Sequence, residues 1–220
     1  MNAHGGLDEH RARFCLRGDT QIKDESNPWS PTASSRLFRY FIVDTISHKA
    51  IIYQLNFIQA FIQSEVKKRM CVVLDKEYEQ FCLNQNGNFG RFLRLKRCLY
   101  GGDFSAKSWY GILDMFLTLE LGFTKSRVEA CLYICRNNKD WIQMINYVND
   151  TLHYANNDQV RLNFEKKLSN RFHLSLLGKA KCYLETKNKE NKDNIKLDQD
   201  QHIKIITSRF EKSFKHLFKG

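Results

Sequence analysis

The residues with the clearest chemical potential lie at 146–154, a stretch that reads NYVNDTLHY. An apolar run ends at Asn149 and Asp150 and resumes after them, so this polar pair falls where a turn between two strands is expected. Both side chains can hydrogen-bond their own backbone and tolerate left-handed conformations, which favours a turn. A carboxylate beside an amide can also hold a divalent cation, which prefers oxygen ligands. A turn and a metal site therefore remain as alternatives for this pair.

The cysteines and histidines offer no comparable site. The chain has seven Cys residues, an odd number with no Cys-x-x-Cys pair, which argues against a disulfide framework and a zinc site. Cys131 and Cys135 are too far apart along a predicted strand to act as paired ligands, and the His residues are scattered. This cysteine usage favours reduced thiols in an intracellular protein.

The elements around the polar pair predict how it is positioned. Apolar patterns indicate strands on both sides of the 149–150 turn, and also at 51–57, 131–135 and 180–184. Helices are expected at 105–121, between a Ser105 cap and Gly122, and at 158–172, with Asp158 as the cap. This order is a β-α-β-β-α-β split arrangement, in which the first strand lies beside the central hairpin. Asn56, near the end of that strand, is therefore expected beside Asn149 and Asp150.

The first hundred residues predict a second set of elements. Residues 11–19 alternate basic and apolar side chains before a Gly-Asp turn, which favours a half-exposed strand. Ser34 or Ser35 is placed to cap a helix with an apolar face. Two further strands are expected at 70–74 and 91–96. Residues 86–88 give a strong turn signal between them.

Composition indicates a folded chain with a polyanionic partner. With 220 residues and 42% hydrophobic content, the chain can bury the core of one domain or of two small subdomains. Its formal net charge of +11 exceeds what solubility needs and favours nucleic acid as the partner, with a basic surface that has no partner as the alternative. No window approaches the roughly 18 apolar residues of a membrane span, and no signal peptide is evident. We expect an intracellular protein, cytoplasmic or nuclear, without a membrane partner.

Six motifs, taken in order, resemble the reverse transcriptase of copia-type LTR retrotransposons. Residues 11–19 resemble the family's K-A-R-L-V-A-R-G-D, and residues 54–61 resemble Q-M-D-V-K-T-A-F. Residues 95–101 resemble L-K-K-S-L-Y-G, and Trp109 follows in the expected place. The remaining motifs follow in family order and spacing, at 121–126, 131–134 and 147–150. The resemblance extends from about residue 11 to about residue 218.

The resemblance implies an α+β fold, made of reverse-transcriptase fingers and a palm of the ferredoxin-like β-α-β-β-α-β type. On this basis the fingers comprise residues 1–38 and 64–99, and the palm comprises 39–63 and a core at 100–190. Residues 191–220 are expected to begin a truncated thumb or connection. The expected chain is a fragment without most of the thumb and without RNase H, integrase or protease segments.

The resemblance also assigns site residues. The family's three catalytic aspartates map to Asn56, Asn149 and Asp150, so only Asp150 keeps a carboxylate for Mg²⁺. An incoming nucleotide is expected at positions that map to Phe61, Ala60, Tyr100, Gly101, Arg11 and Arg13, with Phe61 as a gate against the ribose 2′-hydroxyl. An RNA or DNA template-primer would be the partner. Ordinary structural roles remain the alternatives: strand bonding for Asn56, a turn for Asn149, core packing for Phe61 and a solvated face for the arginines.

Departures from the family pattern fall on the chemistry. Glu185 stands where the family has Gly in the turn that supports the primer end, and Phe104 stands where Gln is usual. Two amides replace two carboxylates that would hold Mg²⁺, so RNA-directed DNA polymerase activity is expected to be impaired or lost. The alternatives are a basic nucleic-acid-binding module without catalysis and a functionless element relic.

Overall fold

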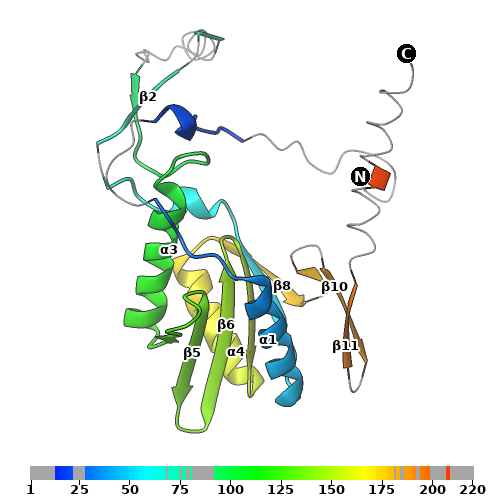
Figure 1. Cartoon of the computed structure of the whole chain (residues 1–220). Helices are drawn as coiled ribbons and strands as arrows, with labels where there is room; N and C mark the ends of the chain where they lie inside the picture. The colour runs from blue at the N-terminus through cyan, green and yellow to red at the C-terminus, as the bar shows by residue number, and fades with distance from the viewer. Residues whose placement is uncertain are drawn as a thin grey trace, which may run out of the picture. The chain divides into compact units, whose positions relative to one another are not determined.

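The computed structural model describes residues 13–21, 28–67, 69–74, 76–77, 80, 92–180, 182–183, 186–191, 194–198 and 207–208. The chain forms two compact units, each built from two stretches of sequence. The first unit comprises Met1–Pro31 and Gln59–Phe116, and the second comprises Thr32–Ile58 and Leu117–Gly220. Helices and antiparallel strands occur together (Figure 1), which confirms the α+β prediction. Within the described ranges, no helix combines the length and the hydropathy that crossing a membrane requires.

A six-stranded antiparallel sheet is the centre of the second unit. Its strand order is β4-β5-β6-β7-β1-β8. In that order the strands span Thr124–Lys125, Leu132–Asn137, Asp140–Tyr147, Asp150–Ala155, Tyr53–Phe57 and Leu174–Lys179. Strand β1 comes first in the chain but lies between β7 and β8. The end of β1 is therefore placed beside the turn between β6 and β7, as the split arrangement predicted.

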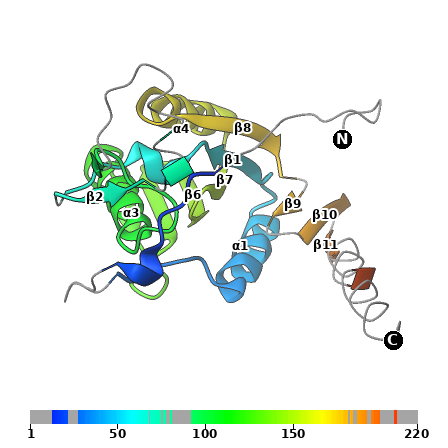
Figure 2. The same cartoon turned by 90° about the horizontal axis from the view of Figure 1, so that it is seen from above.

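Helices α1 (Ser35–Ser47) and α4 (Asp158–Arg171) cover opposite faces of this sheet (Figure 2). Tyr154 of β7 packs edge-on against Phe41 of α1, with ring centroids 4.9 Å apart. The preceding residue, His153, points to the other face because successive strand residues alternate. There its Nε2 atom lies 2.9 Å from Oε1 of Glu165 in α4. The sheet of the second unit is thus enclosed by one helix on each side.

The caps of these two helices lie within one residue of their predicted positions. Ser34 caps α1, since its hydroxyl oxygen accepts a hydrogen bond from the Leu37 N–H at 3.1 Å. Asn157 caps α4 by accepting from the Val160 N–H at 2.9 Å. The prediction of Asp158 as this cap was wrong by one residue. Asn and Asp have nearly equal capping strength, so sequence alone cannot choose between adjacent candidates.

The last strand predicted for the main sheet was placed too late in the chain: the short strand β9 (Cys182–Tyr183) does lie within 180–184, but it belongs to a separate sheet. Strand β8 ends at Lys179, whereas the strand was expected at 180–184. Leu176 and Leu177 of β8 are both about half exposed, and the pairing register with β1 shifts between Gln54 and Leu55. An irregular edge strand with exposed leucines lacks the alternation on which the prediction relied. A separate sheet follows, in the order β11-β10-β9, with bounds Asn194–Asp198, Thr186–Asn191 and Cys182–Tyr183.

Helix α3 (Ser105–Met115) is the longest element of the first unit's described residues. It buries Trp109 and Leu113 and contacts the 3₁₀ helix η2 (Ala60–Gln63). A π-helical turn, η3 (Phe116–Glu120), continues it, and Gly122 follows with a φ of +73°, which fits the predicted stop. Ser105 does not act as the cap. Its hydroxyl instead donates to the Leu99 carbonyl at 2.6 Å.

Short elements make up the remainder of the described first unit. Strands β2 (Cys71–Val73) and β3 (Phe92–Arg94) pair antiparallel where two strands were predicted, and the turn expected at 86–88 lies outside the described residues. The strand predicted at 11–19 is wrong in its described part. Cys15 makes only an isolated bridge to Tyr100, and Gly18–Thr20 form the 3₁₀ helix η1. The Thr20 N–H donates to the Arg17 carbonyl at 3.1 Å, which closes a turn in place of an extended strand.

Candidate active site

Strands β1 and β7 bring Asn56 and Asp150 directly opposite each other. The two residues are partners in the antiparallel register, so their side chains lie on the same face of the sheet. At the end of β1, the Phe57 N–H donates to the Asn149 carbonyl at 2.8 Å. The structure therefore gathers all three residues that were predicted to mark the catalytic position.

The hairpin turn lies one residue earlier than predicted. Tyr147 pairs with Asp150, which leaves Val148 and Asn149 as the turn residues and makes Asp150 the first residue of β7. Val148 has a φ of +55°, a left-handed conformation that is costly for a β-branched side chain. The prediction put Asp150 in the turn because polar residues favour turns. The structure instead places its carboxylate in the strand ladder, facing the side that carries Asn56.

The environment of Asp150 is partly dry and holds little charge. The residue is half-buried, and burial raises the pKa of its carboxyl group, while a hydrogen bond with the Gln54 side chain acts to lower it. The lateral neighbours on this face are Tyr147 in β6 and Asn56 in β1. Neither neighbour carries a formal charge. Gln54 was not predicted as part of the site, although its position two residues before Asn56 places it on the same face of a strand.

The three gathered residues do not fit two magnesium ions. A two-metal site holds its ions roughly 3.5–4 Å apart, and Mg²⁺ is bound through anionic carboxylates. Here one carboxylate, that of Asp150, stands with the neutral amides of Asn56 and Asn149. Across the part of the chain that the structure describes, no group of three or more His, Cys, Asp and Glu residues could hold a metal ion. The donor set therefore lacks the negative charge that two divalent cations require.

Three of the residues expected to contact a nucleotide form a stack in the first unit. The rings of Phe61 and Tyr100 meet at an angle of 60° with centroids 5.0 Å apart. The Arg13 guanidinium carbon lies 5.5 Å from the centre of the Tyr100 ring, in cation-π geometry. Ala60 is buried next to Phe61 in η2, and Arg11 lies outside the described residues. The structure thus brings Arg13, Phe61 and Tyr100 together.

Gly101 has a packing reason of its own. It has a φ of +80°, and a Cβ atom built on it would lie 2.1 Å from the Leu16 carbonyl oxygen. A Cβ on Gly18 would likewise lie 2.1 Å from the Gly101 carbonyl oxygen. Two loops of the first unit therefore meet backbone to backbone through glycines. The resemblance placed Gly101 at the nucleotide position, and the close approach of Leu16 gives this glycine a structural reason as well.

A buried ionic cluster under the α4 face was not predicted. Glu165 lies 2.9 Å from His153 Nε2, and both of its oxygens accept hydrogen bonds from Arg161 at 2.9 Å. The Arg161 guanidinium stacks 4.0 Å from the centre of the Tyr53 ring. Burial lowers the pKa of His153. For Glu165, burial acts to raise the pKa, but the hydrogen bonds from His153 and Arg161 outweigh it and lower the pKa overall. The i,i+4 spacing of Arg161 and Glu165 was a signal for their pairing, whereas the role of His153 needs the fold.

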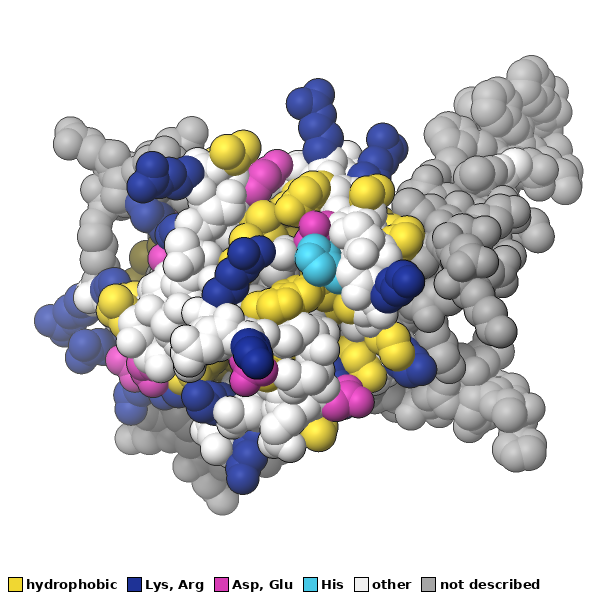
Figure 3. Space-filling model, turned by 90° about the horizontal axis from the view of Figure 1, so that it is seen from below, with side chains coloured by type: hydrophobic (Ala, Val, Ile, Leu, Met, Phe, Trp, Pro, Cys, Tyr) yellow, Lys and Arg dark blue, Asp and Glu magenta, His cyan; other side chains and the backbone are white. Residues whose placement is uncertain are grey.

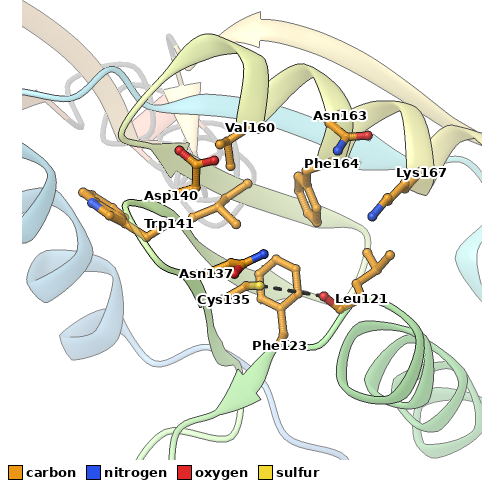
Figure 4. Close-up of a pocket in the computed structure, with 11 residues that line it drawn as sticks. Leu121, Phe123, Cys135, Asn137, Asp140, Trp141, Val160, Asn163, Phe164 and Lys167 are labelled. Carbon is orange, nitrogen blue, oxygen red and sulfur yellow. Dashed lines mark hydrogen bonds between the residues drawn. The ribbon is translucent and has the colours of Figure 1, made fainter.

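A small cavity lies at the other end of the same sheet. It has a volume of 160 Å³ and is formed by α4, the segment that leads into β4, and the hairpin between β5 and β6 (Figure 4). Its wall includes Phe164 and the thiol of Cys135, which donates to the Leu121 carbonyl at 3.7 Å. Asp140, at the start of β6, also lines it, whereas Asn149 follows the opposite end of that strand. The cavity is therefore separate from the Asn56 and Asp150 pair.

Fold and site together define an α+β protein in which a tight hairpin presents an acid opposite the end of the first sheet strand. Residues 4–214 match the model of the family described as reverse transcriptase (RNA-dependent DNA polymerase), and the chain belongs to this family. The resemblance noted from the motifs is thereby confirmed.

The curated relatives are retrotransposon polyproteins. The chain is 24% identical over 215 residues to a retrovirus-related Pol polyprotein from transposon RE1 of Arabidopsis thaliana, a match that covers 94% of the chain and 14% of that polyprotein. It is 25% identical to the corresponding RE2 polyprotein of the same plant, over 78% of the chain and 12% of the relative. It is 23% identical to the transposon Ty1-GR1 Gag-Pol polyprotein of Saccharomyces cerevisiae, over 73% of the chain and 9% of the relative. The chain thus spans less than a sixth of each of these relatives, and no solved structure matches it significantly.

Proposed function

We propose that this chain is the polymerase domain of a copia-type retroelement Pol polyprotein and that it no longer catalyses RNA-directed DNA synthesis. The pairing of Asn56 with Asp150 across β1 and β7 carries this proposal. It places an amide where the family resemblance expects the partner carboxylate of a two-metal site. Asn149, in the adjoining turn, replaces the third carboxylate.

The charge balance explains the proposed loss. Two Mg²⁺ ions at a separation of about 4 Å repel each other strongly in a partly dry site, and carboxylates normally offset that repulsion. Replacing two carboxylates by amides removes two formal negative charges and keeps the side-chain shape. The metals, when bound in this family, activate the attacking hydroxyl and stabilise the leaving phosphate. In this chain Asp150 is left as a half-buried acid whose protonated form is favoured by burial.

At a finer level, we assign the six-stranded sheet to the palm, with a ferredoxin-like β-α-β-β-α-β arrangement. The strand order β6-β7-β1-β8 supports this assignment because it is the antiparallel order of a split β-α-β fold. We assign residues 1–38 and 64–99 to the fingers, 39–63 and 100–190 to the palm, and 191–220 to the start of a thumb or connection. The division into two discontinuous compact units supports a two-part organisation. It differs from the assignment at α3, which lies in the first unit with most of the proposed fingers.

The proposed ligands are an RNA or DNA template-primer and a nucleotide. The stack of Arg13, Tyr100 and Phe61 supports a nucleotide position in the first unit, because Arg13 offers charge to phosphate and the rings offer apolar surface. Ala60, Gly101 and Arg11 belong to the same proposed position by family resemblance. Mg²⁺ is the family's cofactor, and the proposal is that this chain does not hold it as a functional pair.

Primer extension tests the proposal. The purified chain is supplied with a primed RNA template, nucleotides and either Mg²⁺ or Mn²⁺, next to an active reverse transcriptase as the positive control. The expected result is no template-dependent product from this chain. Extension that depends on both template and metal would contradict the proposal.

A second candidate function is nucleic-acid binding without catalysis. The net charge of +11 favours it, because phosphate contacts need charge and not an intact active site. On the face shown in Figure 3, Lys and Arg side chains are scattered, with acidic side chains among them. Such an arrangement supports diffuse contacts with a phosphate backbone over recognition of a particular sequence.

A further inference from the structure

Gln54 lies on the face of the sheet that carries the candidate site. It precedes Asn56 by two residues in β1, so both side chains point to the same side. Its partner in the antiparallel register is Leu152, which follows Asp150 by two residues in β7. Gln54 is thus the diagonal neighbour of Asp150, a separation that a long side chain can bridge.

The strand neighbours directly opposite Gln54 offer its side chain no polar group. Leu152, directly opposite, is fully buried and apolar. On the β8 side, Gln54 pairs with Gly178, which carries no side chain and has no atom within 4 Å of the place where a Cβ would lie. This diagonal position brings the Asp150 carboxylate within reach of the Gln54 amide, and it agrees with the direction in which Gln54 acts on the pKa of Asp150.

We propose that Gln54 is a positioning residue, whose amide holds the Asp150 carboxylate on the face shared with Asn56. Strand β1 is paired on both sides, with β7 and with β8, so the backbone that carries Gln54 is fixed. The amide donates a hydrogen bond without adding a charge, and it therefore orients the carboxylate while leaving the negative charge of the ionised acid intact. The inference rests on the proposed function, because it treats Asp150 as the surviving acid of the polymerase site.

The first experiment tests the contact in the unmodified chain. NMR resonances of the Gln54 side-chain amide are assigned with Gln54→Ala and then followed in Asp150→Ala. We expect one Gln54 amide proton to shift upfield when its acceptor is removed. The amide of Gln159, exposed in the first turn of α4, should not shift and serves as the control. Gln54 resonances that do not respond would overturn the proposal.

The second experiment tests positioning in a chain that carries Asn56→Asp and Asn149→Asp. Binding of Mn²⁺ is measured by electron paramagnetic resonance, with and without Gln54→Ala, after matching melting curves have shown that both variants fold. We expect Gln54→Ala to weaken Mn²⁺ binding about tenfold, as loss of a partner of a metal ligand does, and Gln159→Ala to leave it unchanged. Equal affinities with and without Gln54 would overturn the proposal. If the acid-restored chain takes up no Mn²⁺ at all, the proposed function is contradicted, and the resonance experiment decides the role of Gln54.

Discussion

At the scale of single residues, two amide groups separate this site from one that could hold a metal pair. Asn149 lies in the turn and Asn56 lies across from Asp150, so the two changes affect different strands of the same site. Asn149→Asp alone leaves the site with two carboxylates that belong to one hairpin. The acid contributed by β1 would still be missing.

We therefore predict that Asn149→Asp alone stays inactive in primer extension. The variant should also fold like the unmodified chain, because Asp tolerates turn positions about as well as Asn does. Circular dichroism with matched melting curves provides the folding control. Extension by this single variant at a level comparable with the double variant would show that Asn56 does not matter.

His153 predicts a pH dependence of stability. It is fully buried between β7 and α4 and faces Glu165, Arg161, Tyr53 and Phe164. Because a carboxylate only accepts, Nε2 carries the proton toward Glu165, and Nδ1 has no hydrogen-bond partner among the described residues. Burial depresses the His153 pKa below its unfolded value of about 6.5. Between the two pKa values the unfolded chain binds more protons, so folding stability must fall as the pH falls below about 6.5.

The measurement is the free energy of unfolding in urea at several values between about pH 5 and about pH 8. Stability should be constant above about pH 7 and decline on acidification. His153→Gln, which cannot take up a proton, should remove most of this slope although it lowers stability throughout. Stability that is flat or rises on acidification of the unmodified chain would contradict the assignment of a neutral His153.

At the scale of elements, the contact between two loops of the first unit depends on glycine. A methyl group at Gly101 would meet the Leu16 carbonyl at 2.1 Å, whereas one at Gly122 would meet nothing within 4 Å. Both glycines have positive φ, +80° and +73°. Comparison of the two positions therefore separates backbone strain from a backbone clash.

We predict that Gly101→Ala lowers stability by about 3 kcal/mol or more, since a loop must move, while Gly122→Ala costs about 1 kcal/mol of strain alone. Chemical denaturation of both variants gives the difference. Because Gly122 is the matched control, equal losses would show that the loops do not approach as closely as described.

Much of the element order could be predicted from the sequence, and the exceptions share a cause. Helices α1, α3 and α4 were predicted because each has an apolar face at helical spacing and a polar or glycine residue at its end. The meeting of Asn56 with Asp150 followed from the strand order alone. Strand β8 was misplaced because its exposed leucines and shifted register remove the alternation. Gln54 was missed because its neighbour Asp150 lies far away in the sequence, and the Glu165 cluster was missed because the role of His153 in it needs the fold.

At the scale of the whole molecule, the charge of +11 predicts binding that salt weakens. Each phosphate contact releases counterions, so affinity for single-stranded or hybrid nucleic acid should fall at least about tenfold between about 50 mM and about 200 mM salt. Fluorescence anisotropy measures this slope. A peptide nucleic acid of the same base sequence, which lacks phosphates, should not bind. An affinity that is the same at both salt concentrations would exclude the electrostatic mode.

The whole domain belongs to the reverse-transcriptase family, and we propose that its site has lost its metal pair. Belonging to the family does not by itself decide present activity, because the family match extends over residues 4–214 while the loss rests on two of them. Restoring both acids, with Asn56→Asp and Asn149→Asp, rebuilds the set of three carboxylates around Asp150. Polymerisation requires template, primer and nucleotide as well as metal, so metal binding reports on the site more directly.

The most direct test is a Mn²⁺ titration of the unmodified chain beside the chain with both acids restored, followed by electron paramagnetic resonance. Our account predicts that the restored chain binds Mn²⁺ at least about tenfold more tightly, because hard cations depend on anionic oxygen ligands. Asp150→Asn in the restored chain should reduce the binding again. Equally tight Mn²⁺ binding by the unmodified chain would contradict the claim that Asn56 and Asn149 have disabled this site.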